Sequence, residues 1–120
     1  MSKLIQAQNE FLLDVCKLVA YATSLGYVLT YGEAFRTQEQ QAIYVKTGRS
    51  KTMESQHGKR LAVDFNIFKD GVLQGRDGIK PLGDYWESLR PENRWGGNWR
   101  GLVDSGRSSF VDSPHFERMG

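Results

Sequence analysis

The sequence lacks the features that cross-link a small domain or anchor a chain in a membrane. It has a single cysteine, Cys16, so no internal disulfide can form. No apolar run approaches the roughly 20 residues that a transmembrane helix needs, so we expect no membrane insertion. The 16 Lys and Arg residues nearly balance the 14 Asp and Glu residues, leaving a net charge of +2. Because a dedicated nucleic-acid-binding protein is usually far more basic, we expect no nucleic-acid partner.

Linkers, repeats and a secretion signal are missing as well. Residues 1–10 have neither the apolar core nor the small-residue cleavage site of a signal peptide, so we expect a protein kept in the cytoplasm where it is made. No Pro/Ser-rich stretch or charge block divides the chain, and 120 residues suit a single domain spanning 1–120. No heptad pattern or apolar stripe indicates assembly, so we expect a monomer.

Helices are predicted in three parts of the chain. Apolar residues mostly three or four positions apart predict an amphipathic helix over residues 4–25. Cys16 lies in this helix and is predicted to be a small buried apolar residue. Thr37 is predicted to cap a second helix that runs to about Lys46, and residues 82–89 form a third, short helix.

Between the helices the pattern is that of strands. Residues 61–67 alternate apolar with small or polar side chains, which is typical of a half-buried strand. Asp70-Gly71 indicates a tight turn into a paired strand. The other predicted segments are strands at 27–31, at 72–73 and around Phe116, and loops over the Gly- and Trp-rich residues 94–112. The mixture predicts an α+β fold, a small antiparallel sheet with helices packed on it.

The residues that carry chemistry are the chain's two histidines, His57 and His115, each in a distinctive polar context. Two imidazoles and one carboxylate leave a fourth position open, as a catalytic zinc site requires. Asp64 suits the carboxylate, because it lies on the strand face opposite the apolar stripe. His57 and Asp64 are seven positions apart, so the chain must fold back between them, and Gly58 is suited to that turn.

Two motifs in this order resemble the zinc peptidases of bacterial cell walls. Ser-x-His-(x)4-Ala-x-Asp-Phe begins at Ser55, and Asp-x-x-His-Phe-Glu begins about 50 residues later at Asp112. The intervening Trp-Gly-Gly at 95–97 resembles the segment before the family's last ligand, and the resemblance covers residues 36–117. The family includes D-Ala-D-Ala carboxypeptidases and phage L-alanyl-D-glutamate endopeptidases, and Hedgehog signalling domains share its fold. The zinc peptidase motif often has Gly at the position of Arg60 in this chain.

The resemblance implies a set of site residues. The zinc ligands would be His57, Asp64 and His115, with Asp112 as the catalytic carboxylate that accepts the water proton. The alternative role for Asp112 is to cap the turn before Pro114, a common use of Asp. The remaining implied roles are substrate binding by Arg36 and Ser55, and support of a ligating imidazole by Glu117, which is otherwise expected to be a solvated strand residue.

The function implied is a zinc-dependent peptidase that hydrolyses the stem peptide of bacterial peptidoglycan. Asp rather than Glu at position 112 resembles the phage endopeptidase branch, which predicts an endolysin of L-alanyl-D-glutamate type. Such an enzyme would be stored in the host cytoplasm and reach the wall through a membrane pore made by another protein. The alternatives are a D-Ala-D-Ala carboxypeptidase and a non-catalytic zinc-containing binding module of the Hedgehog kind.

Overall fold

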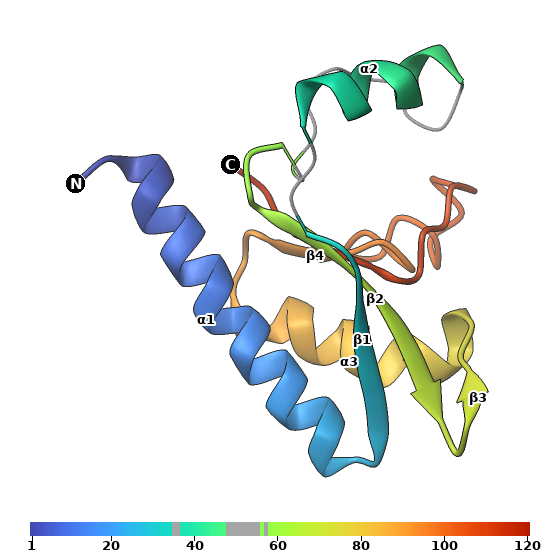
Figure 1. The fold of residues 1–120 in the computed structure, drawn as a ribbon. Coiled ribbons are helices and arrows are strands. Elements are labelled where there is room, and N and C mark those ends of the chain that lie inside the picture. The colour runs from blue at the N-terminus through green and yellow to red at the C-terminus, as the bar shows by residue number, and fades with distance from the viewer. Residues whose placement is uncertain (35–36, 48–55, 57) are drawn as a thin grey trace.

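The computed structural model describes residues 1–34, 37–47, 56 and 58–120 (Figure 1). Its helices are α1 (Lys3–Ser24), α2 (Gln38–Lys46) and α3 (Arg76–Leu89). Its strands are β1 (Tyr27–Glu33), β2 (Ala62–Lys69), β3 (Val72–Leu73), β4 (Asn93–Trp95) and β5 (His115–Arg118). The predicted α+β fold with a small antiparallel sheet is confirmed.

Helices α1 and α2 both begin directly after a capping residue, and the predicted Thr37 cap of α2 is confirmed. The Ser2 hydroxyl accepts the Ile5 N–H at 3.2 Å, and the Thr37 hydroxyl accepts the Gln40 N–H at 3.1 Å. Gly26, with φ of 88°, follows α1 in the left-handed conformation that commonly ends a helix. None of the described helices combines the length and the apolar character that crossing a membrane demands.

Helix α3 begins at Arg76, six residues before the predicted start. Gly78 and Pro81 weaken the helical signal there, since proline and glycine are poor helix formers. Gly83 has a packing reason: a Cβ at this position would overlap the ring of Trp95. Close contact between α3 and β4 therefore outweighs the low helix propensity of this glycine.

The strands form one antiparallel sheet in the order β1-β2-β5-β4, and β3 pairs with the far end of β2. The predicted turn into β3 is confirmed, with φ of 53° at Asp70 and 76° at Gly71. The loop prediction for residues 94–112 is wrong at its start, because Arg94 and Trp95 belong to β4.

One face of the sheet is buried under α1 and α3. Rings from three elements meet there. Trp86 of α3 packs edge-on against Phe11 of α1, with 5.6 Å between ring centroids, and against Phe116 of β5, with 5.9 Å. Phe116 is the register partner of both Val63 and Trp95, so these side chains share the core face. Residues one position along each strand then point to the opposite face.

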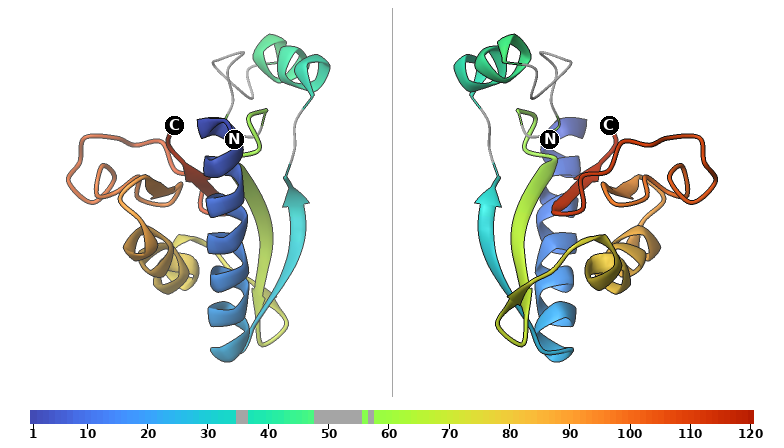
Figure 2. Two further views of the ribbon diagram at one scale, coloured as in Figure 1. Left: turned by 90° about the vertical axis from the view of Figure 1, so that its left-hand side faces the viewer. Right: turned by 90° about the vertical axis from the view of Figure 1, so that its right-hand side faces the viewer.

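Two parts of the molecule lie outside this core. Helix α2 stands away from α1 and α3, beyond the end of the sheet where β1 stops (Figure 2). Cys16 of α1 is exposed, so its predicted burial is wrong. The neighbouring Asp14 and Val15 are buried instead, which places the packed stripe of α1 beside Cys16 rather than on it.

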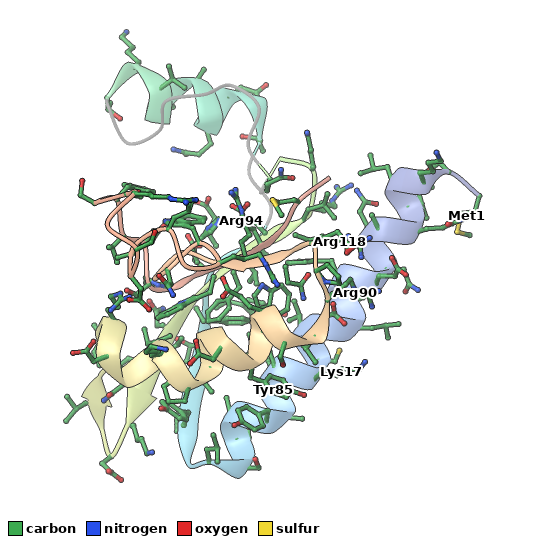
Figure 3. The ribbon with its side chains drawn as sticks, turned by 180° about the vertical axis from the view of Figure 1, so that it is seen from behind. Met1, Lys17, Tyr85, Arg90, Arg94 and Arg118 are labelled. Atoms are coloured by element: carbon green, nitrogen blue, oxygen red, sulfur yellow. The ribbon has the colours of Figure 1, made fainter. Side chains whose placement is uncertain are left out.

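A buried ion pair fastens α1 to the segment after α3. The Asp14 carboxylate is 0% exposed and accepts from Arg90 Nε at 2.9 Å and from Asn93 Nδ2 at 3.1 Å. Glu10 pairs with both Arg90 and Arg118, which lie beside α1 (Figure 3). Burial raises the pKa of Asp14, but the hydrogen bonds from Arg90 and Asn93 outweigh it and leave that pKa below its ordinary value.

Candidate metal centre

The open face of the sheet brings Asp64 of β2 and His115 of β5 together. The two residues are register partners in the antiparallel pairing, so their side chains project from the same face. His115 Nδ1 lies 2.9 Å from Asp64 Oδ1. The predicted convergence of this carboxylate and this imidazole is therefore present, although 51 positions separate them in the chain.

Asp112 joins them from the turn before β5. Its N–H donates to the Gly96 carbonyl at 2.8 Å, and its carbonyl accepts the His115 N–H at 3.1 Å. A Cβ at Gly96 would overlap the Asp112 carbonyl, so the glycine permits the two segments to approach. The Trp95 indole also donates to the Ser113 carbonyl at 2.7 Å, which holds the same turn from its buried side.

Asp64, Asp112 and His115 can hold a metal ion together. One ligand atom from each lies within 4.8 Å of the other two, and His115 Nδ1 is 4.0 Å from Asp112 Oδ2. Imidazole nitrogen and carboxylate oxygen are donors that zinc accepts. The donor chemistry therefore fits the predicted ion. Asp112, predicted as a catalytic carboxylate, lies close enough to the other two to act as a ligand or as a base.

The second ring nitrogen of His115, Nε2, contacts a buried carboxylate. Glu117 Oε1 lies 2.7 Å from His115 Nε2, and Glu117 is only 5% exposed. The expectation of a solvated strand residue is therefore wrong, and the alternative, support of the imidazole, is what the geometry shows. Carboxylates in this position hold a ligating imidazole in one tautomer and one orientation.

Arg94 of β4 holds Glu117 in turn. Its Nε and Nη2 atoms both donate to Glu117 Oε2, at 3.1 and 2.7 Å. Sequence analysis did not identify Arg94. Its place opposite Glu117 in the sheet register is the only signal, and that register is not visible in the sequence.

These carboxylates determine the charge of His115. Burial lowers the pKa of this imidazole, but hydrogen bonds to Asp64 and Glu117 outweigh that effect and raise the pKa to about 9. Burial likewise raises the pKa of Glu117, while His115 and Arg94 bring it below its ordinary value. In the metal-free protein His115 is therefore protonated at neutral pH, and an ion that takes Nδ1 must displace a proton.

Three predicted site residues, Arg36, Ser55 and His57, lie outside the described residues, so their roles stay predictions. The turn next to them is described: the Leu61 N–H donates to the Gln56 carbonyl at 2.8 Å, so the chain does fold back before β2. Within that turn Arg60 adopts a left-handed conformation, with φ of 57°. Glycine is the residue favoured in this conformation, which accounts for its frequent use at this position in the family the motifs resemble.

Comparison with known proteins gives consistent results. Residues 48–118 match the sequence profile of the D-alanyl-D-alanine carboxypeptidase family. The L-alanyl-D-glutamate peptidase of Listeria phage A118 is 36% identical over 106 residues, which are 84% of this chain and 34% of that protein. The chain thus spans about a third of the length of this relative.

Two solved structures share the fold. The L-Ala D-Glu endopeptidase ChiX of Serratia marcescens superposes with a TM-score of 0.65 at 24% identity, covering 88% of this chain and 78% of that one. The vancomycin-resistance D,D-pentapeptidase VanY, solved in complex with Zn(II), gives a TM-score of 0.56 at 19% identity, covering 92% of this chain and 71% of that one. The predicted D,D-peptidase-like fold is confirmed.

Proposed function

This chain belongs to the D-alanyl-D-alanine carboxypeptidase family of peptidases, and we propose that it is a zinc-dependent hydrolase of the stem peptide of bacterial peptidoglycan. The observation that carries the proposal is the cluster of Asp64, Asp112 and His115 on the open face of the sheet, with one donor atom from each within 4.8 Å of the others. The proposed ligands are His57, Asp64 and His115, and the proposed single zinc peptidase domain spans residues 1–120.

The bond proposed is the one between L-Ala and D-Glu. Similarity to the phage L-alanyl-D-glutamate peptidase supports this choice, as does Asp rather than Glu at position 112. The competing activity, removal of the terminal D-Ala, is supported by the match to the D-alanyl-D-alanine carboxypeptidase family. Both reactions hydrolyse an amide in the same stem, so they differ in which bond the protein places at the cluster.

Zinc, when bound, would supply a Lewis acid that makes water reactive at neutral pH and polarises the scissile carbonyl. Asp112 would accept the proton of the attacking water on its carboxylate and deliver it to the nitrogen of the leaving amine. Glu117 holds His115 at the ring nitrogen that faces away from Asp64. Arg36 and Ser55 are proposed to contact the substrate, with the guanidinium pairing with a carboxylate of the stem.

The products distinguish these activities. The zinc-loaded protein is incubated with purified muropeptides, and the fragments are identified by mass spectrometry. New D-Glu amino termini with L-Ala carboxyl termini support the endopeptidase, whereas release of D-Ala alone supports the carboxypeptidase. A zinc-loaded protein that hydrolyses no wall preparation favours the binding module. Asp112→Asn is the control, because hydrolysis that persists in this variant comes from a contaminant or from a mechanism without this base.

The proposed setting is the host cytoplasm, with access to the wall through a pore made by another protein. Production inside a bacterium should then leave cells intact until the membrane is permeabilised from outside. Rapid lysis after permeabilisation is expected for the wild type and not for Asp112→Asn. Lysis of intact cells without any permeabilising agent would contradict this route. A monomer is expected, and light scattering after size-exclusion chromatography measures it.

A further inference from the structure

Two aromatic side chains lie beside the metal centre and take no part in the chemistry described above. The Trp99 ring packs at 47° to the His115 imidazole with 5.5 Å between centroids. The Phe110 ring stacks on Trp99 with 5.9 Å between centroids and 16° between planes. Phe110 is nevertheless 64% exposed, and Val111 beside it is 40% exposed. The pair extends an apolar surface outward from the imidazole toward solvent.

Hydrogen bonds hold this surface in place. The Trp99 indole donates to the Phe110 carbonyl at 3.0 Å, and two residues later the Asp112 N–H donates to the Gly96 carbonyl at 2.8 Å. Trp99 itself adopts φ of 48°, a conformation that is unfavourable for a bulky residue and persists only where surrounding contacts impose it. The Phe110 ring is thus presented beside the site by a braced segment.

A flat exposed ring of this kind suits one part of the proposed substrate. The side chains of the stem peptide are alanine methyl groups and carboxylate- or amine-bearing chains, none of which offers a large flat apolar surface. The sugar that carries the stem does, on the C–H face of its pyranose ring. Small apolar side chains are usually bound in concave pockets, whereas a flat ring stacks on an exposed aromatic face.

The distances between the rings agree with cleavage of the L-Ala–D-Glu bond. Trp99 lies between Phe110 and His115, and its ring centroid is 5.9 Å from that of Phe110 and 5.5 Å from that of His115. In the stem, one residue of about 3.5 Å and a lactyl linker separate the L-Ala–D-Glu bond from the sugar ring. Cleavage at the terminal D-Ala would move the sugar three residues, roughly 10 Å, farther away. Of these two bonds, the L-Ala–D-Glu bond is therefore the one that places the sugar within reach of the aromatic surface.

We propose that Phe110, supported by Trp99, is a carbohydrate subsite that stacks on the muramic acid residue bearing the stem peptide. This inference rests on the proposed peptidase function and adds a preference for glycan-linked over free stem peptides. Phe110 is a substrate-contacting residue in this proposal, and its ring has no part in the metal centre or in proton transfer.

Two substrates that differ only in the sugar test the proposal. One is the free stem peptide, and the other is the same peptide attached to the N-acetylglucosaminyl-N-acetylmuramic acid disaccharide. The wild type should show a kcat/KM about five- to tenfold higher on the glycan-linked substrate, the scale of one aromatic stacking contact. Phe110→Ala should abolish this preference, chiefly by raising KM on the glycan-linked substrate. Phe110→Tyr, which keeps the ring, should restore it.

Leu73→Ala is the matched control, because Leu73 is 62% exposed and lies on β3 at the far end of β2 from the site. Equal loss on both substrates in Phe110→Ala would overturn the proposal, and so would a wild type without any preference.

If the zinc-loaded wild type hydrolyses neither substrate, the peptidase function fails and a binding measurement tests the subsite by itself. Trp86 and Trp95 are 0% exposed, so a change in tryptophan fluorescence on adding the disaccharide reports mainly on Trp99. The change should appear in the wild type and disappear in Phe110→Ala, and an unchanged wild-type signal would count against the subsite.

Discussion

Replacing Glu117 by Gln should weaken zinc binding in a way that depends on pH. The substitution keeps the size of the side chain but removes the charge that His115 Nε2 contacts at 2.7 Å. Loss of a carboxylate behind a ligating imidazole typically costs 10- to 100-fold in metal affinity. The same loss lowers the pKa of His115 from about 9. At neutral pH a smaller fraction of the imidazole is then protonated, so zinc has fewer protons to displace.

Below pH 9 the weaker support of the imidazole and the reduced competition from protons change zinc affinity in opposite directions. Above pH 9 only the weaker support remains. At pH 9 and above, where proton competition is small, we expect Glu117→Gln to bind zinc about 10- to 100-fold more weakly than the wild type. At pH 7 the deficit should be clearly smaller, because the wild type then has to release a proton that the variant holds less tightly. Zinc titration against a competing chelator at both pH values measures this difference.

A matched variant shows whether the effect is local. Glu10→Gln also removes a carboxylate from an arginine pair, with Arg118 at 2.9 Å, but lies on α1 outside the metal cluster. It should leave zinc affinity unchanged at both pH values. An equal deficit for Glu117→Gln at pH 7 and pH 9 would refute the proton-competition reasoning, and no deficit at either pH would refute the supporting role of Glu117.

Three further predictions concern other parts of the molecule. Asp112→Asn should retain zinc in the chelator titration while hydrolysis of purified cell walls falls by at least 100-fold; retained activity would remove Asp112 from its role. Since the pKa of Asp14 is lowered by folding, its contribution is complete above about pH 4 and is lost as pH falls through the folded-state value. Wild-type urea midpoints should therefore fall between pH 5 and pH 2 more steeply than those of Asp14→Asn, which should itself be less stable by about 2 kcal/mol at pH 7. Gly83→Ala should lower Tm by about 4–12 °C because its Cβ meets Trp95, whereas Gly78→Ala meets only the flexible Gln74 side chain and should change Tm little.

Local patterns in the sequence predicted most of the fold. The apolar spacing of α1, the Thr37 cap of α2 and the alternation around β2 are short-range signals, and each led to the element that the structure shows. The start of α3 was missed because Gly78 and Pro81, both poor helix formers, lie in its first turns. Cys16 was misjudged because the helical period alone does not define the edge of the buried stripe.

The residues of the candidate site also differ in whether the sequence alone identifies them. Asp64, Asp112 and His115 were identified because the two motifs that contain them resemble those of the cell-wall zinc peptidases. Arg94 was not, because an arginine on a short strand has no distinctive spacing and gains its role only by facing Glu117 across β4 and β5. The aromatic surface at Phe110 was missed because it lies in a stretch predicted only as loop.

By itself, the sequence determined which side chains alternate around β2, where the first two helices begin, and which donor types are available for an ion. Only the tertiary structure decided that Asp64 faces His115 across two strands, and that Glu117 is buried behind the imidazole. Periodicity arises from neighbours along the chain, within a few residues. Strand register arises from hydrogen bonds and core packing between segments about 50 residues apart, and no local pattern encodes it.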